Sequence, residues 1–98
     1  MNKLKVIWSI KSKQQLKIIF DFYKLISVEV ANNVKESILK SGRDLIFVEQ
    51  YQQDEIEPEF RRIIVGHYKL VYIIEEKTII ILRIFDTRRN PKNQIENI

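Results

Sequence analysis

Three cations lie in the apolar segments near the end of this chain, at Arg62, Lys69 and Arg83. Residues 68–74 and 79–85 are rich in β-branched and aromatic residues, which favours two strands. Side chains alternate between the faces of a strand, so the three cations fall on one face of the predicted sheet. Like charges opposed on a sheet destabilise it by up to about 1 kcal/mol, which gives this face the character of an anion-binding site. The alternative is that the long side chains extend into water at little cost.

The register between these strands decides which side chains meet. Two apolar sets are expected to face the core: Tyr68, Leu70, Tyr72 and Ile74 on the first strand, and Ile80, Leu82 and Ile84 on the second. Aligning both sets requires an odd-numbered loop at residues 75–78 or a bulge, and in that register Lys69 can lie directly opposite Arg83. Residues 62–65 add a third strand through a type II′ turn at Gly66 and His67, which brings Arg62 to the cationic face.

The last strand is followed by a second charged group, Asp86, Arg88 and Arg89. Asp86 is a possible internal partner for Arg88 or Lys69, while the arginines are candidates for binding a target.

Other chemistry has little support in the sequence. Two glycines give no phosphate-binding loop, and one histidine without cysteine gives no zinc cluster, so no metal or cofactor is expected. A hydrolytic triad has no candidate residues. His67 is more typical of an exposed turn residue than of a catalyst. Glu55, Glu57 and Glu59 favour a solvated acidic loop over paired acid/base carboxylates.

Length and charge narrow the class of protein. The 98 residues are enough for one domain spanning residues 1–98, and the composition is that of a globular protein. Neither a signal peptide nor a membrane span is evident, which predicts a cytoplasmic protein with no membrane partner. The net charge of +4 is uneven: residues 1–42 and 60–92 are basic and residues 43–59 are acidic. This pattern suits nucleic acid or an acidic protein as the partner.

The elements that would position these residues follow from the hydrophobic periods. Residues 3–9 indicate a first strand. A helix is expected from an N-cap at Ser12, with a broad apolar stripe that predicts burial on more than one side: Leu16, Ile18, Ile19, Phe20, Phe22, Tyr23, Leu25 and Ile26. Ser27 caps a second helix with Glu29 in its first turn and an inner face of Ala31, Val34, Ile38 and Leu39, and Gly42 is its stop signal.

Residues 45–48 are ambiguous between helix, strand and a hydrophobic plug, and residues 50–58 indicate an exposed loop. The result is an α+β fold of order β-α-α-β-β-β, in which a two-helix hairpin packs on an antiparallel sheet. The first strand joins the sheet at an edge that the pattern leaves open.

Several segments together resemble the RelE/ParE superfamily of bacterial toxins from type II toxin–antitoxin systems. They are VIWS at residues 6–9, FRRIIVGHYKLVY at 60–72, TIIILRIF at 78–85 and DTRRNP at 86–91. Lys69 stands where arginine is usual in the family's tyrosine-arginine-leucine-valine-tyrosine strand. The resemblance implies a growth-inhibiting toxin, of the kind tied to plasmid stabilisation, that is neutralised by a cognate antitoxin.

The superfamily offers two activities. RelE-like members cut messenger RNA on the ribosome, and by position Lys69, Arg83 and Arg88, or Arg89, would be the catalytic cations. ParE-like members inhibit DNA gyrase, and residues 86–92 would then matter more than Lys69. Neither Tyr nor His follows Tyr72, whereas the nucleases often carry one after the last strand. The interpretation as a ParE-like gyrase inhibitor is therefore favoured. The alternatives are the ribosome-dependent endoribonuclease and an inactive homologue that only binds the antitoxin.

Overall fold

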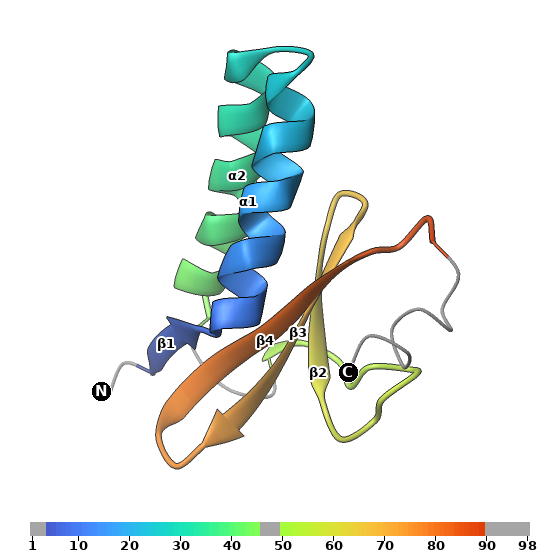
Figure 1. Cartoon of the computed structure of the whole chain (residues 1–98). Coiled ribbons are helices and arrows are strands. Elements are labelled where there is room, and N and C mark those ends of the chain that lie inside the picture. Colours follow the sequence, from blue (N-terminus) through green and yellow to red (C-terminus); the bar gives the residue numbers. More distant parts are fainter. Residues whose placement is uncertain (1–3, 46–49, 90–98) are drawn as a thin grey trace.

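The computed structural model describes residues 4–45 and 50–89. The elements are β1 (Lys5–Trp8), α1 (Ile10–Lys24), α2 (Val28–Arg43), β2 (Arg61–Val65), β3 (Tyr68–Glu75) and β4 (Thr78–Asp86). The helices form a hairpin that stands beside the sheet and extends beyond it (Figure 1). The predicted α+β class and element order are confirmed. The expectations for residues 46–48 and for Asn90 and Pro91 lie outside the described residues.

The four strands form one sheet in the order β1-β4-β3-β2. The pairs β2–β3 and β3–β4 are antiparallel, as expected for consecutive hairpins. The first strand takes the edge next to β4 and runs parallel to it, with Trp8 opposite Ile81, so the sheet is mixed. The helical hairpin supplies the long crossover that a parallel connection requires.

A β-bulge at Leu82 sets the facing of β4. Glu75 pairs with Thr78 across a two-residue turn, but the register shifts between Val71 and Tyr72 and leaves Leu82 without an opposite residue. The bulge allowed by the sequence pattern is therefore present. The Leu82 carbonyl accepts a hydrogen bond from the Ser9 hydroxyl, and the Ile84 N–H, two residues further along β4, donates to Gln15 Oε1 at 2.7 Å. The start of α1 thus satisfies the backbone groups that the bulge releases from the ladder.

The position of the bulge corrects the predicted core face. Ile79 and Ile81 are fully buried, although the period-two pattern that turns Ile80 toward the core places both of them on the other face. Ile80 and Leu82, predicted to face the core, are only half-buried, whereas Ile84 is buried as expected. The period-two rule fails here because one extra residue inverts the facing of all residues on one side of it. On β3, Tyr68, Leu70 and Tyr72 are buried as predicted, and Ile74 is exposed at the hairpin end.

The helix ends confirm one cap and correct two predictions. Ser27 caps α2, accepting from the Val30 N–H at 3.3 Å. Ser9 caps α1, not Ser12, because the Ser9 hydroxyl accepts from the Ser12 N–H at 3.0 Å. Gly42 lies inside α2 instead of ending it. A Cβ there would approach the Trp8 ring to 2.9 Å, so the glycine allows the helix to pack closely on β1 and β4.

The hydrophobic core lies between the helical hairpin and one face of the sheet. Its buried members come from both layers, including Leu16, Ile38, Leu70, Tyr72 and Ile81. Ala31 and Ile38 on α2 are buried and Val34 and Leu39 half-buried, as predicted.

The outer face of α1 departs from prediction. Ile10, Ile18, Phe22 and Leu25, here called the outer stripe, are 76%, 68%, 56% and 87% exposed. Ile26, at the turn between the helices, is exposed as well. The prediction that α1 is buried on more than one side is therefore wrong for the described residues. The rest of the fold covers the side of α1 that carries Leu16 and leaves the outer stripe exposed. No helix in the described ranges is long and apolar enough to cross a membrane.

Candidate functional site

The sheet brings the three predicted cations together on the face away from the helices. Arg62 lies opposite Val71, which lies opposite Arg83 on its other side, and Lys69 lies opposite Phe85. Lys69 and Arg83 are therefore diagonal neighbours, whereas the sequence pattern had suggested that they lie directly opposite each other. The bulge adds one residue to β4. Every residue of β4 after Leu82 therefore pairs one position away from where a regular hairpin would place it. The prediction that Arg62, Lys69 and Arg83 share a face is confirmed.

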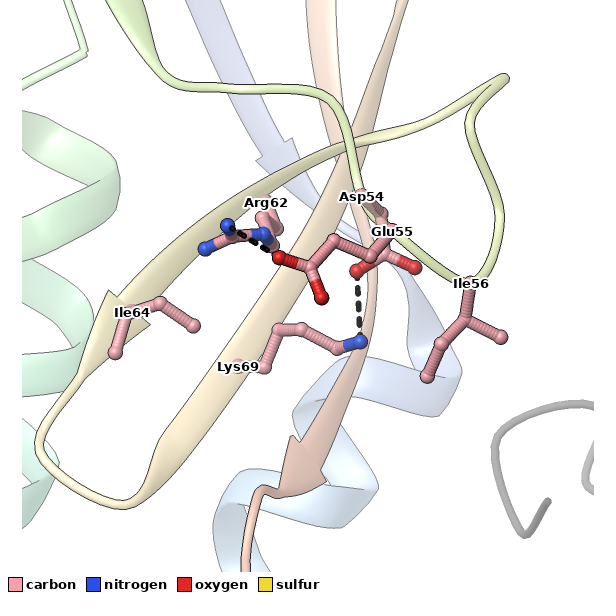
Figure 2. A pocket seen from close by; sticks show the side chains of 6 residues that line it. All are labelled: Asp54, Glu55, Ile56, Arg62, Ile64 and Lys69. Carbon is pink, nitrogen blue, oxygen red and sulfur yellow. Dashed lines mark hydrogen bonds and ion pairs between the residues drawn. The ribbon is translucent and has the colours of Figure 1, made fainter. Parts of the chain in front are cut away.

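Two of these cations are held in buried ion pairs. Lys69 Nζ lies 2.7 Å from Asp54 Oδ1, with 11% and 0% of the two side chains exposed (Figure 2). Arg83 Nη2 donates to both carboxylate oxygens of Glu57 at 3.1 Å, and these side chains are 10% and 9% exposed. A buried charge without a partner would be strongly unfavourable, so each acid makes burial of its cation possible.

The acids reach the face because residues 50–60 fold against the edge of β2. Gln53 pairs with Arg61 in an antiparallel bridge, the Asp54 N–H donates to Phe60 O at 2.8 Å, and the Arg62 N–H donates to Gln52 O at 3.0 Å. The other Asp54 oxygen accepts from the Glu57 N–H at 2.9 Å. The sequence missed both acids, since Glu57 was expected in a solvated loop. The signal that could have found them is the acidic block between two basic ones.

Aromatic rings line the same face. The Arg83 guanidinium lies 5.3 Å from the centre of the Phe85 ring and 5.7 Å from that of Phe60. The Lys69 ammonium lies 6.0 Å from the Phe85 ring. These cation–π contacts hold the two charged groups over β4 independently of the carboxylates.

A pocket of about 230 Å³ opens beside Lys69 (Figure 2), and it is lined by Asp54, Glu55, Ile56, Arg62, Ile64 and Lys69. Arg62 stands at its rim, 3.2 Å from Gln52 Oε1 and 3.7 Å from Glu55 Oε1. Glu55 is largely exposed, in agreement with the expected acidic loop. Arg62 is thus less enclosed than Lys69 or Arg83 and remains in contact with solvent.

The second charged group lies at the end of β4. Arg88 Nε and Nη2 donate to the two Asp86 oxygens at 2.9 and 2.8 Å, which confirms one of the two partners considered for Asp86. These hydrogen bonds from Arg88 lower the pKa of the Asp86 carboxyl from 3.8 to about 2 and raise the pKa of the Arg88 guanidinium. Arg89 is exposed, and its N–H donates to Asp86 O at 3.1 Å.

Tyr68 and Tyr23 connect this end of the sheet to α1. Their hydroxyls are 3.3 Å apart, and Tyr68 lies opposite Asp86 in the sheet. Burial, and then the hydrogen bond to Tyr23, raise the pKa of Tyr68, so its hydroxyl stays protonated at neutral pH. His67 is exposed in its turn, as expected, and its carbonyl accepts from Thr87. Among the residues that the structure describes, no group of His, Cys, Asp and Glu could hold a metal ion.

Comparisons with known proteins identify a family for the chain and agree with its fold. Residues 6–91 match the model of a protein family described as the ParE toxin of the type II toxin–antitoxin system parDE. Among solved structures, a chain of the chromosomal ParDE TA system from P. aeruginosa superposes with a TM-score of 0.75 at 24% identity. The match covers 85% of this chain and 95% of that one, and it supports the same fold. A search of curated sequences gives no match.

Proposed function

The chain belongs to the family of ParE toxins of type II toxin–antitoxin systems, and we propose that it inhibits growth by poisoning DNA gyrase and is neutralised by a cognate antitoxin. The family supports a toxin with a paired antitoxin. The choice of gyrase over messenger RNA rests on the state of the cationic sheet face.

The buried pairing of Lys69 and Arg83 is the observation that carries this choice. An endoribonuclease needs cations that are open to the phosphate as negative charge develops on it. Here Asp54 and Glu57 occupy the positions next to both cations, at 2.7 and 3.1 Å. An RNA phosphate brought to this face would meet two carboxylates together with the two cations, which removes most of the electrostatic gain.

The proton-transfer groups support the same choice. RNA cleavage through a 2′-hydroxyl needs a general base and an acid within reach of the scissile phosphate. The last tyrosine of the chain is Tyr72 and its single histidine is His67. Tyr72 is fully buried in the core, and His67 is in the β2–β3 turn. Both positions are unsuited to proton transfer on the cationic face.

For contact with gyrase, the end of β4 offers the more accessible charges. Arg88 is 53% exposed and is fixed in orientation by its two hydrogen bonds to Asp86. Arg89 is exposed beside it. We assign Asp86, Arg88 and Arg89 to the target-contacting group, with Asp86 acting by positioning Arg88.

The test compares the two activities with one purified protein. DNA supercoiling by gyrase and cleavage of messenger RNA on ribosomes are measured in parallel, and we expect loss of supercoiling with intact RNA. Arg88→Ala and Arg89→Ala are expected to relieve inhibition, whereas Lys77→Ala, a matched exposed cation at the β3–β4 turn, is not. Cleavage of messenger RNA on ribosomes with gyrase unaffected would replace this proposal by the endoribonuclease. Growth unaffected by expression of the soluble protein alone would favour an inactive homologue.

A further inference from the structure

We propose that Asp54 and Glu57 are specificity-determining residues that occupy the anion-binding face of Lys69 and Arg83 and thereby keep nucleic-acid phosphates from binding there. The inference concerns what the sheet face excludes, so it holds for a gyrase inhibitor and for an inactive homologue, and it would fail for an endoribonuclease.

The chemistry of the two ion pairs is that of a bound anion. A carboxylate oxygen at 2.7 Å from Lys69 Nζ, and two at 3.1 Å from Arg83 Nη2, take the places that phosphate oxygens would take on the same cations. Each carboxylate neutralises one cation. A phosphate placed at this face would therefore gain little attraction and would meet like charges, which oppose its binding.

The cations themselves are positioned for binding without their acids. Phe85 lies beneath both charged groups, at 6.0 Å from Lys69 Nζ and 5.3 Å from the Arg83 guanidinium carbon. Phe60 adds a second ring beside Arg83 at 5.7 Å. Because these contacts do not involve Asp54 or Glu57, neutralising an acid should leave the two cations on the face instead of releasing them.

Asp54 and Glu57 lie in a segment that is held to β2 by backbone hydrogen bonds. The bridge between Gln53 and Arg61 and the hydrogen bond from the Asp54 N–H to Phe60 O attach the segment to β2. The Asp54 carboxylate also accepts from the Glu57 N–H, which fixes the two acids relative to each other. A loosely attached acidic loop could be displaced by a polyanion, whereas this segment would have to break backbone pairing as well.

Arg62 and the pocket beside Lys69 mark where a polyanion would approach. Arg62 is 20% exposed at the pocket rim, and Glu55, 86% exposed, is its neighbour at 3.7 Å. The Glu55 carboxylate therefore places a negative charge beside Arg62 at the pocket rim, as Asp54 and Glu57 do beside Lys69 and Arg83 on the buried part of the face. Removing its charge changes the same electrostatic surface without disturbing a buried pair.

The experiment measures binding of a labelled single-stranded RNA oligonucleotide by fluorescence anisotropy at low ionic strength. Glu57→Gln keeps the size of the side chain and one oxygen acceptor for Arg83 but removes the charge. We expect it to raise RNA affinity at least about tenfold over the unmodified protein. The matched control is Glu36→Gln, which removes one exposed acid paired with Arg43 on α2 and is expected to change affinity less than about twofold. Adding Arg83→Gln to Glu57→Gln should abolish the gain.

Thermal melting of each variant shows whether it is folded, and Glu55→Gln provides a second test that does not depend on the buried pair. It is expected to raise affinity by about twofold to threefold, since the pair that it breaks is exposed. Equal RNA affinity of folded Glu57→Gln and Glu36→Gln would overturn the proposal, as would tight RNA binding by the unmodified protein. If Glu57→Gln does not fold, the absence of any gain in Glu55→Gln over Glu36→Gln overturns it.

Discussion

The cationic face of the sheet and the outer stripe of α1 differ in what covers them. Lys69 and Arg83 are polar groups enclosed by the chain's own acids, whereas Ile18 and Leu25 are apolar groups left in solvent. Residue type alone would assign the opposite environments. The difference lies in the presence of a partner: a segment paired to β2 reaches the cations, and the second layer of the fold stops short of the outer stripe.

This difference separates internal stability from exposed surface. A charge that is buried with a partner depends on that partner for the stability of the fold. An exposed apolar side chain contributes little to folding, so its substitution should be tolerated. Mutations in the two regions therefore have opposite expected consequences.

The largest expected effect is on the cationic face. Asp54→Ala leaves Lys69 buried without its carboxylate and removes the acceptor for the Glu57 N–H, so we expect the free energy of unfolding to fall by about 3–5 kcal/mol. Urea denaturation measures the loss. Asp21→Ala is the matched control, because its pair with Lys17 is exposed and should cost less than about 1 kcal/mol. Similar losses in both variants would mean that the Lys69 pair is open to solvent.

A second prediction tests how the bulge determines which side of β4 is covered. Ile81→Ala should cost about 2–5 kcal/mol, since Ile81 is fully buried against the helices. Ile80→Ala, at the neighbouring half-buried position on the other face, should cost clearly less. Chemical denaturation of both variants gives the comparison. A larger loss for Ile80 would place the bulge elsewhere on β4.

Much of this architecture was predictable from local patterns. The order of the elements, the cap at Ser27, the turn at Gly66 and the shared face of Arg62, Lys69 and Arg83 follow from periodicity and turn chemistry, which act over a few residues. Pairing of Asp86 with Arg88 is also local, at two residues apart.

The missed features depend on residues far apart in the sequence. The acids that cover Lys69 and Arg83 are 15 and 26 residues away from them. The bulge at Leu82 is stabilised by Ser9 and Gln15 from the other end of the chain. The apolar stripe on α1 favoured burial, but a pattern carries no information on whether the chain itself supplies a covering surface, and in the structure the outer stripe is exposed.

The pair at the end of β4 should give a small effect that depends on pH. The folded-state pKa of Asp86, about 2, lies below its ordinary value of 3.8, so the stabilisation is present above about pH 4 and is lost as pH falls through 2. Because Arg88 is 53% exposed, solvent screens the pair, and we expect its contribution to the free energy of unfolding to be small. NMR titration should show the pKa of Asp86 rising in Arg88→Gln. An Asp86 pKa near 4 in the unmodified protein would contradict the pairing.

The smallest expected effect is on the outer stripe, and it can be measured within one helix. Ile18→Ala removes a side chain that is 68% exposed, and alanine favours the helix slightly, so the free energy of unfolding should stay within about 0.5 kcal/mol. Leu16→Ala, on the opposite face of α1 at 8% exposure, should lose about 2–5 kcal/mol.

Denaturation at two protein concentrations distinguishes the causes of a different result. If Ile18→Ala were as costly as Leu16→Ala at both concentrations, another part of the same chain would have to cover the outer stripe. If the cost grew with protein concentration, a second molecule would cover it. A negligible cost at both concentrations would show that the outer stripe contributes nothing to folding, and its apolar residues would then need a reason other than stability.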